Sequence, residues 1–174
     1  WRLGHFVIPN ELTKLKNSLK VLASETFSSV SAPIQYAAIV AYQNDHSNYL
    51  NNSRKILKLV GDYVYENLRS NKILINKPQG GFYLMPEFLE MKFKNSEEMC
   101  TNLLDNTGVA LLPGSDFGFS KNKLIARLSF TDFHGKKFMD NFSNRTKLDN
   151  KLVEKFAPKI VEGTKRLKHW VEST

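Results

Sequence analysis

The chain has 174 residues and a formal net charge of +8. Its content of 41% hydrophobic and 24% charged residues is typical of a globular protein. Its length suits one domain, or one domain with a flanking piece. The single Cys100 excludes a disulfide framework and is typical of a reducing compartment. No apolar stretch approaches the length of a membrane span and none has the pattern of a signal peptide, so we expect a cytoplasmic protein with no membrane partner.

The first part of the chain predicts one strand-like run and three helices. The strand-like run is Trp1–Pro9. Asn10 is a candidate N-cap for a helix whose leucines recur at helical spacing, namely Leu12, Leu15, Leu19 and Leu22. Pro33 is typical of the first turn of a second helix. A third, longer helix is predicted over Ser47–Ser70 by an apolar stripe of Leu50, Ile56, Leu57, Val60, Tyr63, Val64 and Leu68.

Two strands are predicted on either side of a glycine pair. The strands are Ile73–Ile75 and Phe82–Met85, and the pair is Gly80-Gly81. Paired glycines indicate a turn that needs a positive φ, or a close approach of the backbone to another group.

A helix and a strand follow. Asn95 and Glu98 form a capping box for a helix that ends at Gly108. The apolar run Val109–Leu112 then predicts a strand that stops at a Pro-Gly turn, followed by a polar loop over Asp116–Lys123.

The stretch Leu124–Phe130 alternates as a strand does, but it carries an arginine in the middle of an apolar run. Alternation places Arg127 on the same face as Ile125 and Ser129. A guanidinium stays charged, and its burial without a partner costs about several kcal/mol, so Arg127 requires an anion. The planar fork fits a carboxylate in a bidentate manner. The alternative is an arginine on an edge strand that points to water or pairs with a nearby Asp or Glu.

Beyond Gly135 the chain predicts two more helices, Lys137–Asn144 and Lys151–Trp170. Pro158 predicts a kink or break in the second one, because proline lacks the N–H that a helix interior uses.

Other kinds of site find little support. The histidines match no metal-binding spacing, so we expect no metal site; they are His5, His46, His134 and His169. Cys100 lies in an amphipathic helical stretch, where a buried thiol is expected rather than a nucleophile. The positive charge raises the alternative of an independent basic α+β domain that binds nucleic acid. The lysines are scattered, however, and we expect no nucleic-acid partner; the densest sets are Lys14/Lys16/Lys20 and Lys165/Arg166/Lys168.

Four sequence blocks occur in a fixed order. They are W-R-L-G, P-x-G-x-F-Y, G-V-x-x-x-P-G-S-x-F-G and R-L-S-F, at Trp1–Gly4, Pro78–Tyr83, Gly108–Gly118 and Arg127–Phe130. Together they resemble the C-terminal portion of the class I/II (fold-type I) aminotransferases, which depend on pyridoxal phosphate (PLP). The resemblance fades beyond Gly135.

The resemblance implies an α/β fold with an α+β small domain. Residues 1–46 would be the C-terminal end of the PLP-binding large domain. Residues 47–174 would be the interdomain helix and the small domain, a short sheet backed by helices. In the family, the Schiff-base lysine lies shortly before the W-R-x-G block, so it would precede Trp1. We therefore expect a fragment with no catalytic residue of its own, inactive in isolation.

The resemblance also implies roles for two arginines. Arg2 matches the family arginine that binds the cofactor phosphate, and Arg127 matches the one that binds the substrate α-carboxylate. The implied function is PLP-dependent transfer of an amino group between an amino acid and a 2-oxo acid, in a homodimer. The alternatives are a PLP-dependent lyase or synthase of the same fold, and a non-catalytic relative that acts as a regulator or binding module.

Overall fold

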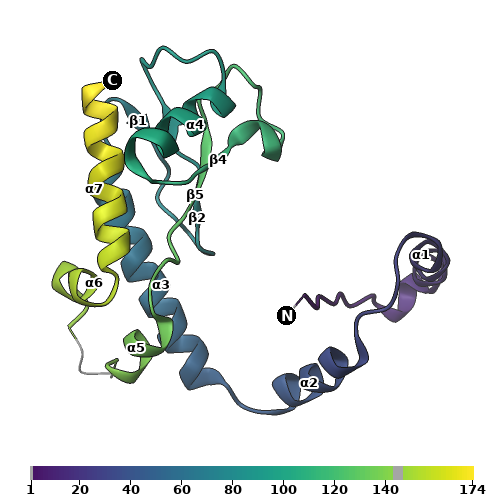
Figure 1. Ribbon diagram of the computed structural model, residues 1–174. Coiled ribbons are helices and arrows are strands. Elements are labelled where there is room, and N and C mark those ends of the chain that lie inside the picture. The colour runs from purple at the N-terminus through teal and green to yellow at the C-terminus, as the bar shows by residue number, and fades with distance from the viewer. Residues whose placement is uncertain (1, 143–146) are drawn as a thin grey trace. The chain divides into compact units, whose positions relative to one another are not determined.

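A computed structural model of the chain describes residues 2–142 and 147–174 (Figure 1). The chain divides into two compact units, Trp1–Ser47 and Asn48–Thr174, called unit 1 and unit 2 here. Each is described by itself. Trp1, which opens the first sequence block, lies outside the described residues, as do residues 143 and 144 of the predicted helix Lys137–Asn144.

Unit 1 consists of an extended segment followed by helices. A 3₁₀ turn, η1 (Asn10–Leu12), leads into α1 (Thr13–Thr26), and α2 (Ala32–Gln43) follows. Asn10 is not the predicted N-cap: it lies inside η1, and its backbone carbonyl accepts a 2.7 Å hydrogen bond from the Thr13 hydroxyl. Pro33 lies in the first turn of α2, as predicted.

The strand-like run at the start of unit 1 is not a strand in its described residues, 2–9. A strand exists only where a second strand takes up its backbone hydrogen bonds, and an apolar pattern alone does not supply that partner. One side-chain contact fixes the run locally: the Tyr42 hydroxyl and His5 Nδ1 are 2.7 Å apart, with the two rings edge to face.

No residue of 2–47 is buried. The exposed set includes many large apolar side chains, with Phe6, Val21, Leu22, Phe27, Tyr36, Val40 and Tyr42 each more than half exposed. A soluble surface rarely carries so many large apolar groups on so short a segment, so unit 1 has the composition of a core without the burial of one.

Unit 2 contains five helices in its described part. They are α3 (Ser47–Leu68, whose first residue belongs to unit 1), α4 (Ser96–Thr107), α5 (Gly135–Asp140), α6 (Asn150–Phe156) and α7 (Pro158–Ser173). The predicted break at Pro158 is confirmed, because α6 ends and α7 begins on either side of Ala157.

The predicted ends of α4 are confirmed. The Asn95 carboxamide oxygen accepts a 2.8 Å bond from the Glu98 N–H, and the Glu98 carboxylate accepts a 2.7 Å bond from the Lys94 N–H. Glu98 thus reaches one residue further back than in the usual capping box. Gly108 closes the helix with a left-handed φ of 71°.

Two small antiparallel sheets complete unit 2. In the first, β1 (Ile73–Leu74) pairs with β3 (Glu87–Phe88). The second has the order β2-β5-β4, formed by β2 (Tyr83–Leu84), β4 (Leu112–Pro113) and β5 (Ala126–Ser129).

The strands are shorter than their apolar runs, and one was not predicted at all. Of the predicted strand Val109–Leu112, only Leu112 lies in β4. The N–H of Val109 instead donates to the Thr107 hydroxyl at 3.1 Å, which belongs to the end of α4. The strand β3 has only two residues, and its polar Glu87 gave no apolar alternation to recognise.

The core of unit 2 draws on α3, α4, α7 and the second sheet. On β5 and its flanks, Ala126, Leu128 and Phe130 are buried on one face of the strand. Full burial of a leucine or phenylalanine stabilises the fold by about 1.5–3 kcal/mol, so this face fixes the register of β5 and with it the direction of the opposite face.

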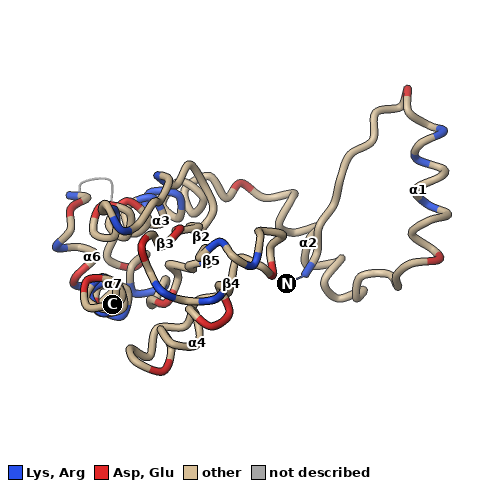
Figure 2. Tube along the Cα trace, turned by 90° about the horizontal axis from the view of Figure 1, so that it is seen from above, with Lys and Arg blue, Asp and Glu red and all other residues tan. Residues whose placement is uncertain are grey.

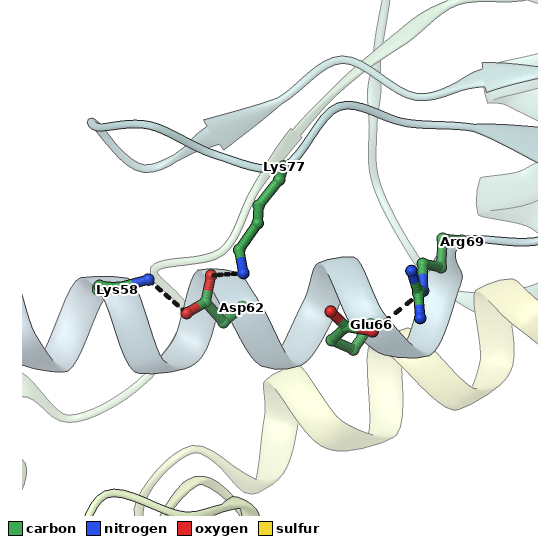
Figure 3. A network of polar contacts seen from close by, with 5 residues as sticks. All are labelled: Lys58, Asp62, Glu66, Arg69 and Lys77. Atoms are coloured by element: carbon green, nitrogen blue, oxygen red, sulfur yellow. Dashed lines mark hydrogen bonds and ion pairs between the residues drawn. The ribbon is translucent and has the colours of Figure 1, made fainter.

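A small charge network on α3 braces the segment that leads into β2 (Figure 3). Asp62 lies 2.6 Å from the Lys58 ammonium through Oδ2 and 3.8 Å from that of Lys77 through Oδ1. The longer distance is too great for a hydrogen bond, so Lys77 acts on Oδ1 through charge alone. Partly exposed pairs of this kind contribute about 0–1 kcal/mol each, which suits a role in orientation more than in stability.

Two helix-interior glycines should respond oppositely to alanine. A Cβ at Gly163 of α7 would meet nothing within 4 Å, whereas one at Gly61 of α3 would lie 3.0 Å from the buried Phe130 ring. Alanine is favoured over glycine within helices by about 0.5–1 kcal/mol. We expect Gly163→Ala to raise the free energy of unfolding by about that amount, and Gly61→Ala to lower it by about 1 kcal/mol or more.

Urea unfolding of both variants and the parent chain measures this difference. Because each substitution removes the same backbone freedom from the unfolded chain, the contrast isolates the close packing of Gly61 against Phe130 and Pro78. Equal shifts in the two midpoints would contradict the close packing of Gly61.

Candidate functional site

Arg127 lies on the central strand of the three-stranded sheet. The predicted alternation holds along β5: Ala126 and Leu128 face the core, while Arg127 and Ser129 face the other way. The Arg127 side chain is half-buried. The edge-strand alternative is therefore wrong, because β5 has a hydrogen-bonded neighbour on each side.

Two aromatic rings contact the Arg127 guanidinium. Its Cζ atom lies 4.4 Å from the centre of the Tyr83 ring and 4.3 Å from that of the Phe117 ring. Both distances fall within the range of cation–π contact. Among the described residues no Asp or Glu forms a salt bridge with Arg127. The charge is thus held by rings and left without a protein counter-ion in that part of the chain.

The two rings come from the two neighbours of β5. Tyr83 belongs to β2 and pairs with Ser129, one step along from Arg127 on the same face. Phe117 ends the 3₁₀ turn η2 (Gly114–Phe117), which directly follows β4. The residue opposite Arg127 on β4 is Leu112. The side chains around the guanidinium are therefore aromatic and aliphatic.

Gly114 sets the position of the turn that carries Phe117. Its N–H donates a 2.7 Å hydrogen bond to the Ile125 carbonyl, and a Cβ at this position would lie 2.8 Å from the same oxygen. Only glycine permits so close an approach of the two backbones. Gly118 then leaves the turn with a left-handed φ of 83°, which a side chain would strain.

On the other side, β2 is entered through the glycine pair as predicted. Gly81 has φ 68°, and the Phe82 carbonyl accepts a 3.2 Å bond from the Phe130 N–H. The sequence pointed to Arg127 but not to its contacts with Tyr83 and Phe117. Both aromatic residues lie in the recognised blocks, yet nothing in their spacing shows that a strand and a 3₁₀ turn bring them to one guanidinium.

Arg2 is exposed and belongs to unit 1, whereas Arg127 belongs to unit 2. No salt bridge joins its guanidinium to another described residue. Its backbone has φ 63°, a conformation that costs a non-glycine residue about 1–2 kcal/mol. A guanidinium without a counter-ion can bind a phosphate or a carboxylate through its N–H donors.

Other candidate centres are not supported among the described residues. No three His, Cys, Asp or Glu side chains there are grouped to hold a metal ion. Over the same residues, no helix is both long and apolar enough to cross a membrane. The lysines and arginines are spread over several elements of unit 2, with acidic residues between them (Figure 2).

Cys100 is buried within α4, as predicted. Burial raises the pKa of its thiol to about 11, with a smaller contribution from the negative charge of Asp116. A thiol with such a pKa is protonated at neutral pH, so it does not serve as a nucleophile.

Comparison with known proteins identifies the family. The sequence profile of "Aminotransferase class I and II" matches residues 1–133. The chain belongs to this family. The aspartate aminotransferase of Bacillus subtilis is 33% identical over 135 residues, which are 75% of this chain and 33% of that protein. The aspartate aminotransferase of Bacillus sp. is 32% identical over 123 residues, 68% of this chain and 30% of its own length.

A solved structure shows that the fold extends beyond the matched profile. The alanine aminotransferase from Pyrococcus furiosus superposes with a TM-score of 0.68 at 25% identity, over 95% of this chain and 36% of that one. The prediction of an α/β aminotransferase fold is thereby confirmed. The chain spans about a third of the length of these relatives.

Aminotransferases of this class depend on PLP. The described residues fit one part of that cofactor: the exposed Arg2 guanidinium has no protein anion among them and suits the phosphate group.

The buried thiol gives a test of packing next to the site, because Asp116 lies in η2. At pH 8 we expect the folded chain to react with an aromatic disulfide reagent far more slowly than the urea-unfolded chain, with a rate that climbs as pH approaches 11.

An unfolded thiol ionises near 9.0 and the folded one near 11, so the free energy of unfolding should also fall over this pH interval. Cys100→Ala is the control, because it removes the part of this fall that the thiol causes. Rapid labelling of the folded chain at pH 8 would show that α4 does not bury Cys100.

Proposed function

We propose that the longer protein to which this chain corresponds transfers an amino group between an amino acid and a 2-oxo acid, with PLP as cofactor. The observation that carries the proposal is Arg127: a half-buried guanidinium on a central strand, with no acidic partner among the described residues, in a chain of the aminotransferase family. A substrate carboxylate is the anion that this arrangement lacks.

In this proposal Arg127 works by position. A bidentate pair fixes both the location and the plane of the substrate carboxylate, which sets the orientation of the Cα–H bond of the amino acid. The aromatic and aliphatic surroundings remove part of the hydration of the half-buried guanidinium, which strengthens the charge–charge attraction. The cofactor, when bound, supplies the electron sink for the reacting carbon.

Arg2 is proposed to hold the phosphate of PLP. The guanidinium provides several N–H donors in a fixed plane, and a phosphate dianion accepts them. Neither arginine makes or breaks a bond of the substrate in this scheme. Both bind and orient, and no catalytic residue is assigned to this chain.

We propose that further polypeptide completes the fold and that the whole protein is a cytoplasmic homodimer. Two observations support completion: unit 1 buries none of its residues 2–47, and the chain spans about a third of its relatives. The exposed apolar residues of α1 and α2 are the surface that such polypeptide would cover.

The role of Arg127 is tested by Arg127→Lys in the longer protein. Lysine keeps the charge and loses the fork, which removes at least one charge-assisted hydrogen bond worth about 1.5–3 kcal/mol. We expect kcat/KM to fall by about 10- to 100-fold, and further in Arg127→Gln.

Arg69→Lys is the matched control, because Arg69 also contacts an aromatic ring but pairs with Glu66. It should leave kcat/KM within about twofold of the parent. Parent-like turnover of Arg127→Lys would remove Arg127 from the substrate site.

The chain alone is expected to lack the activity. Mixed with PLP, it should give only weak, non-saturating absorbance changes in the visible range, from scattered surface lysines. A stoichiometric absorbance band that responds to added amino acids would contradict the assignment of the catalytic lysine to further polypeptide.

A further inference from the structure

The surroundings of Arg127 pose a physical question that the carboxylate role does not answer. A half-buried arginine normally keeps its direction through an ion pair, but no acidic side chain pairs with this one among the described residues. Without a partner, its flexible stem would let the guanidinium turn toward water, as arginines on a protein surface do. Another contact must hold it.

The Tyr83 and Phe117 rings supply that contact. Their centres lie 4.4 and 4.3 Å from the Arg127 Cζ, the separation expected when a guanidinium lies against the face of a ring. A face contact uses the plane of the guanidinium and leaves the N–H groups at its edge free. An acidic partner would have occupied those N–H groups instead.

The two rings are anchored independently. Tyr83 is held by its strand pairing with Ser129. Phe117 is held by the turn that Gly114 fixes against the Ile125 carbonyl. Because the supports come from the two neighbours of β5, loss of one ring would leave the other in place.

We propose that Tyr83 and Phe117 are positioning residues: together they form an aromatic clamp that holds the plane of Arg127 and leaves its fork open for a carboxylate. The carboxylate-binding role of the clamp rests on the proposed function, whereas the contacts of the two rings with Arg127 do not depend on it. It makes the carboxylate site ready before the ligand arrives, which lowers the entropy lost on binding.

The clamp has a direct spectroscopic signature in the 174-residue chain. Protons that lie over an aromatic ring are shielded by its ring current, so the Arg127 Nε–Hε resonance should lie upfield of ordinary arginine resonances. Its assignment comes from the signal that disappears in Arg127→Lys. In Tyr83→Leu and Phe117→Leu the resonance should move part of the way back, and in the double variant all the way.

Conservative variants separate the ring from the fold. Tyr83→Phe and Phe117→Tyr keep a ring and should keep the shifted resonance. Phe119→Leu is the matched control, because Phe119 lies two residues beyond Phe117 with a similar exposure of 41% against 39%, and it is not one of the rings over Arg127. It should leave the resonance unchanged.

The second measurement is the affinity for pyruvate, used as a simple 2-oxo acid, by titration of the same resonance at constant ionic strength with chloride as the reference anion. We expect the parent chain, Tyr83→Phe and Phe119→Leu to respond alike. Each leucine variant of the clamp should bind pyruvate about three- to tenfold more weakly, the loss expected for one cation–π contact.

The outcomes separate the clamp from the function. An unshifted resonance in the parent chain, or a shifted one that both leucine substitutions leave unchanged, overturns the clamp. A shifted, ring-dependent resonance that does not respond to pyruvate supports the clamp and counts against Arg127 as the carboxylate site. A loss of affinity in Tyr83→Phe equal to that in Tyr83→Leu overturns the role of the ring.

Discussion

The positive charge of Arg127 is the constraint around which the sheet of unit 2 is arranged. A guanidinium cannot shed its charge, and its half-buried place on a central strand removes part of its hydration. Among the described residues, two aromatic rings contact the guanidinium and no carboxylate pairs with it. Rings stabilise the cation without consuming its hydrogen-bond donors, so the site keeps an unsatisfied demand for an anion. In the proposed function, a substrate carboxylate takes up those donors.

The rest of unit 2 serves the placement of one strand. The buried face of β5 fixes its register, so that every second residue points away from the core. The contact between Gly114 and the Ile125 carbonyl brings η2 to the strand, and Gly118 turns the chain away again. The absence of a side chain is what matters at Gly114, since a Cβ there would collide with the Ile125 carbonyl and displace the turn that carries Phe117. Site geometry here depends on backbone approach as much as on side chains.

Local signals in the sequence predicted local structure well. The α4 ends followed from Asn95, Glu98 and Gly108, because capping involves residues a few positions apart. The alternation around Arg127 also followed, because a strand buried on one face must alternate. The run Trp1–Pro9 shows the limit: its pattern suited a strand, but a strand is made by its partner, and its described residues have none. The predicted strand Val109–Leu112 was too long at its start for the same reason, because only its Leu112 pairs with a neighbouring strand.

The aromatic clamp lies beyond such reasoning for a related cause. Tyr83 is far from Phe117 and Arg127 in sequence, and the strand order β2-β5-β4 brings the three residues together. The alternation indicated that Arg127 needs an anion, but not that the described residues supply none. An acidic residue paired with Arg127 would have filled the fork. In the proposed role of Arg127, a fork without an acidic partner among the described residues is the expected arrangement, because a carboxylate from solution can then reach it.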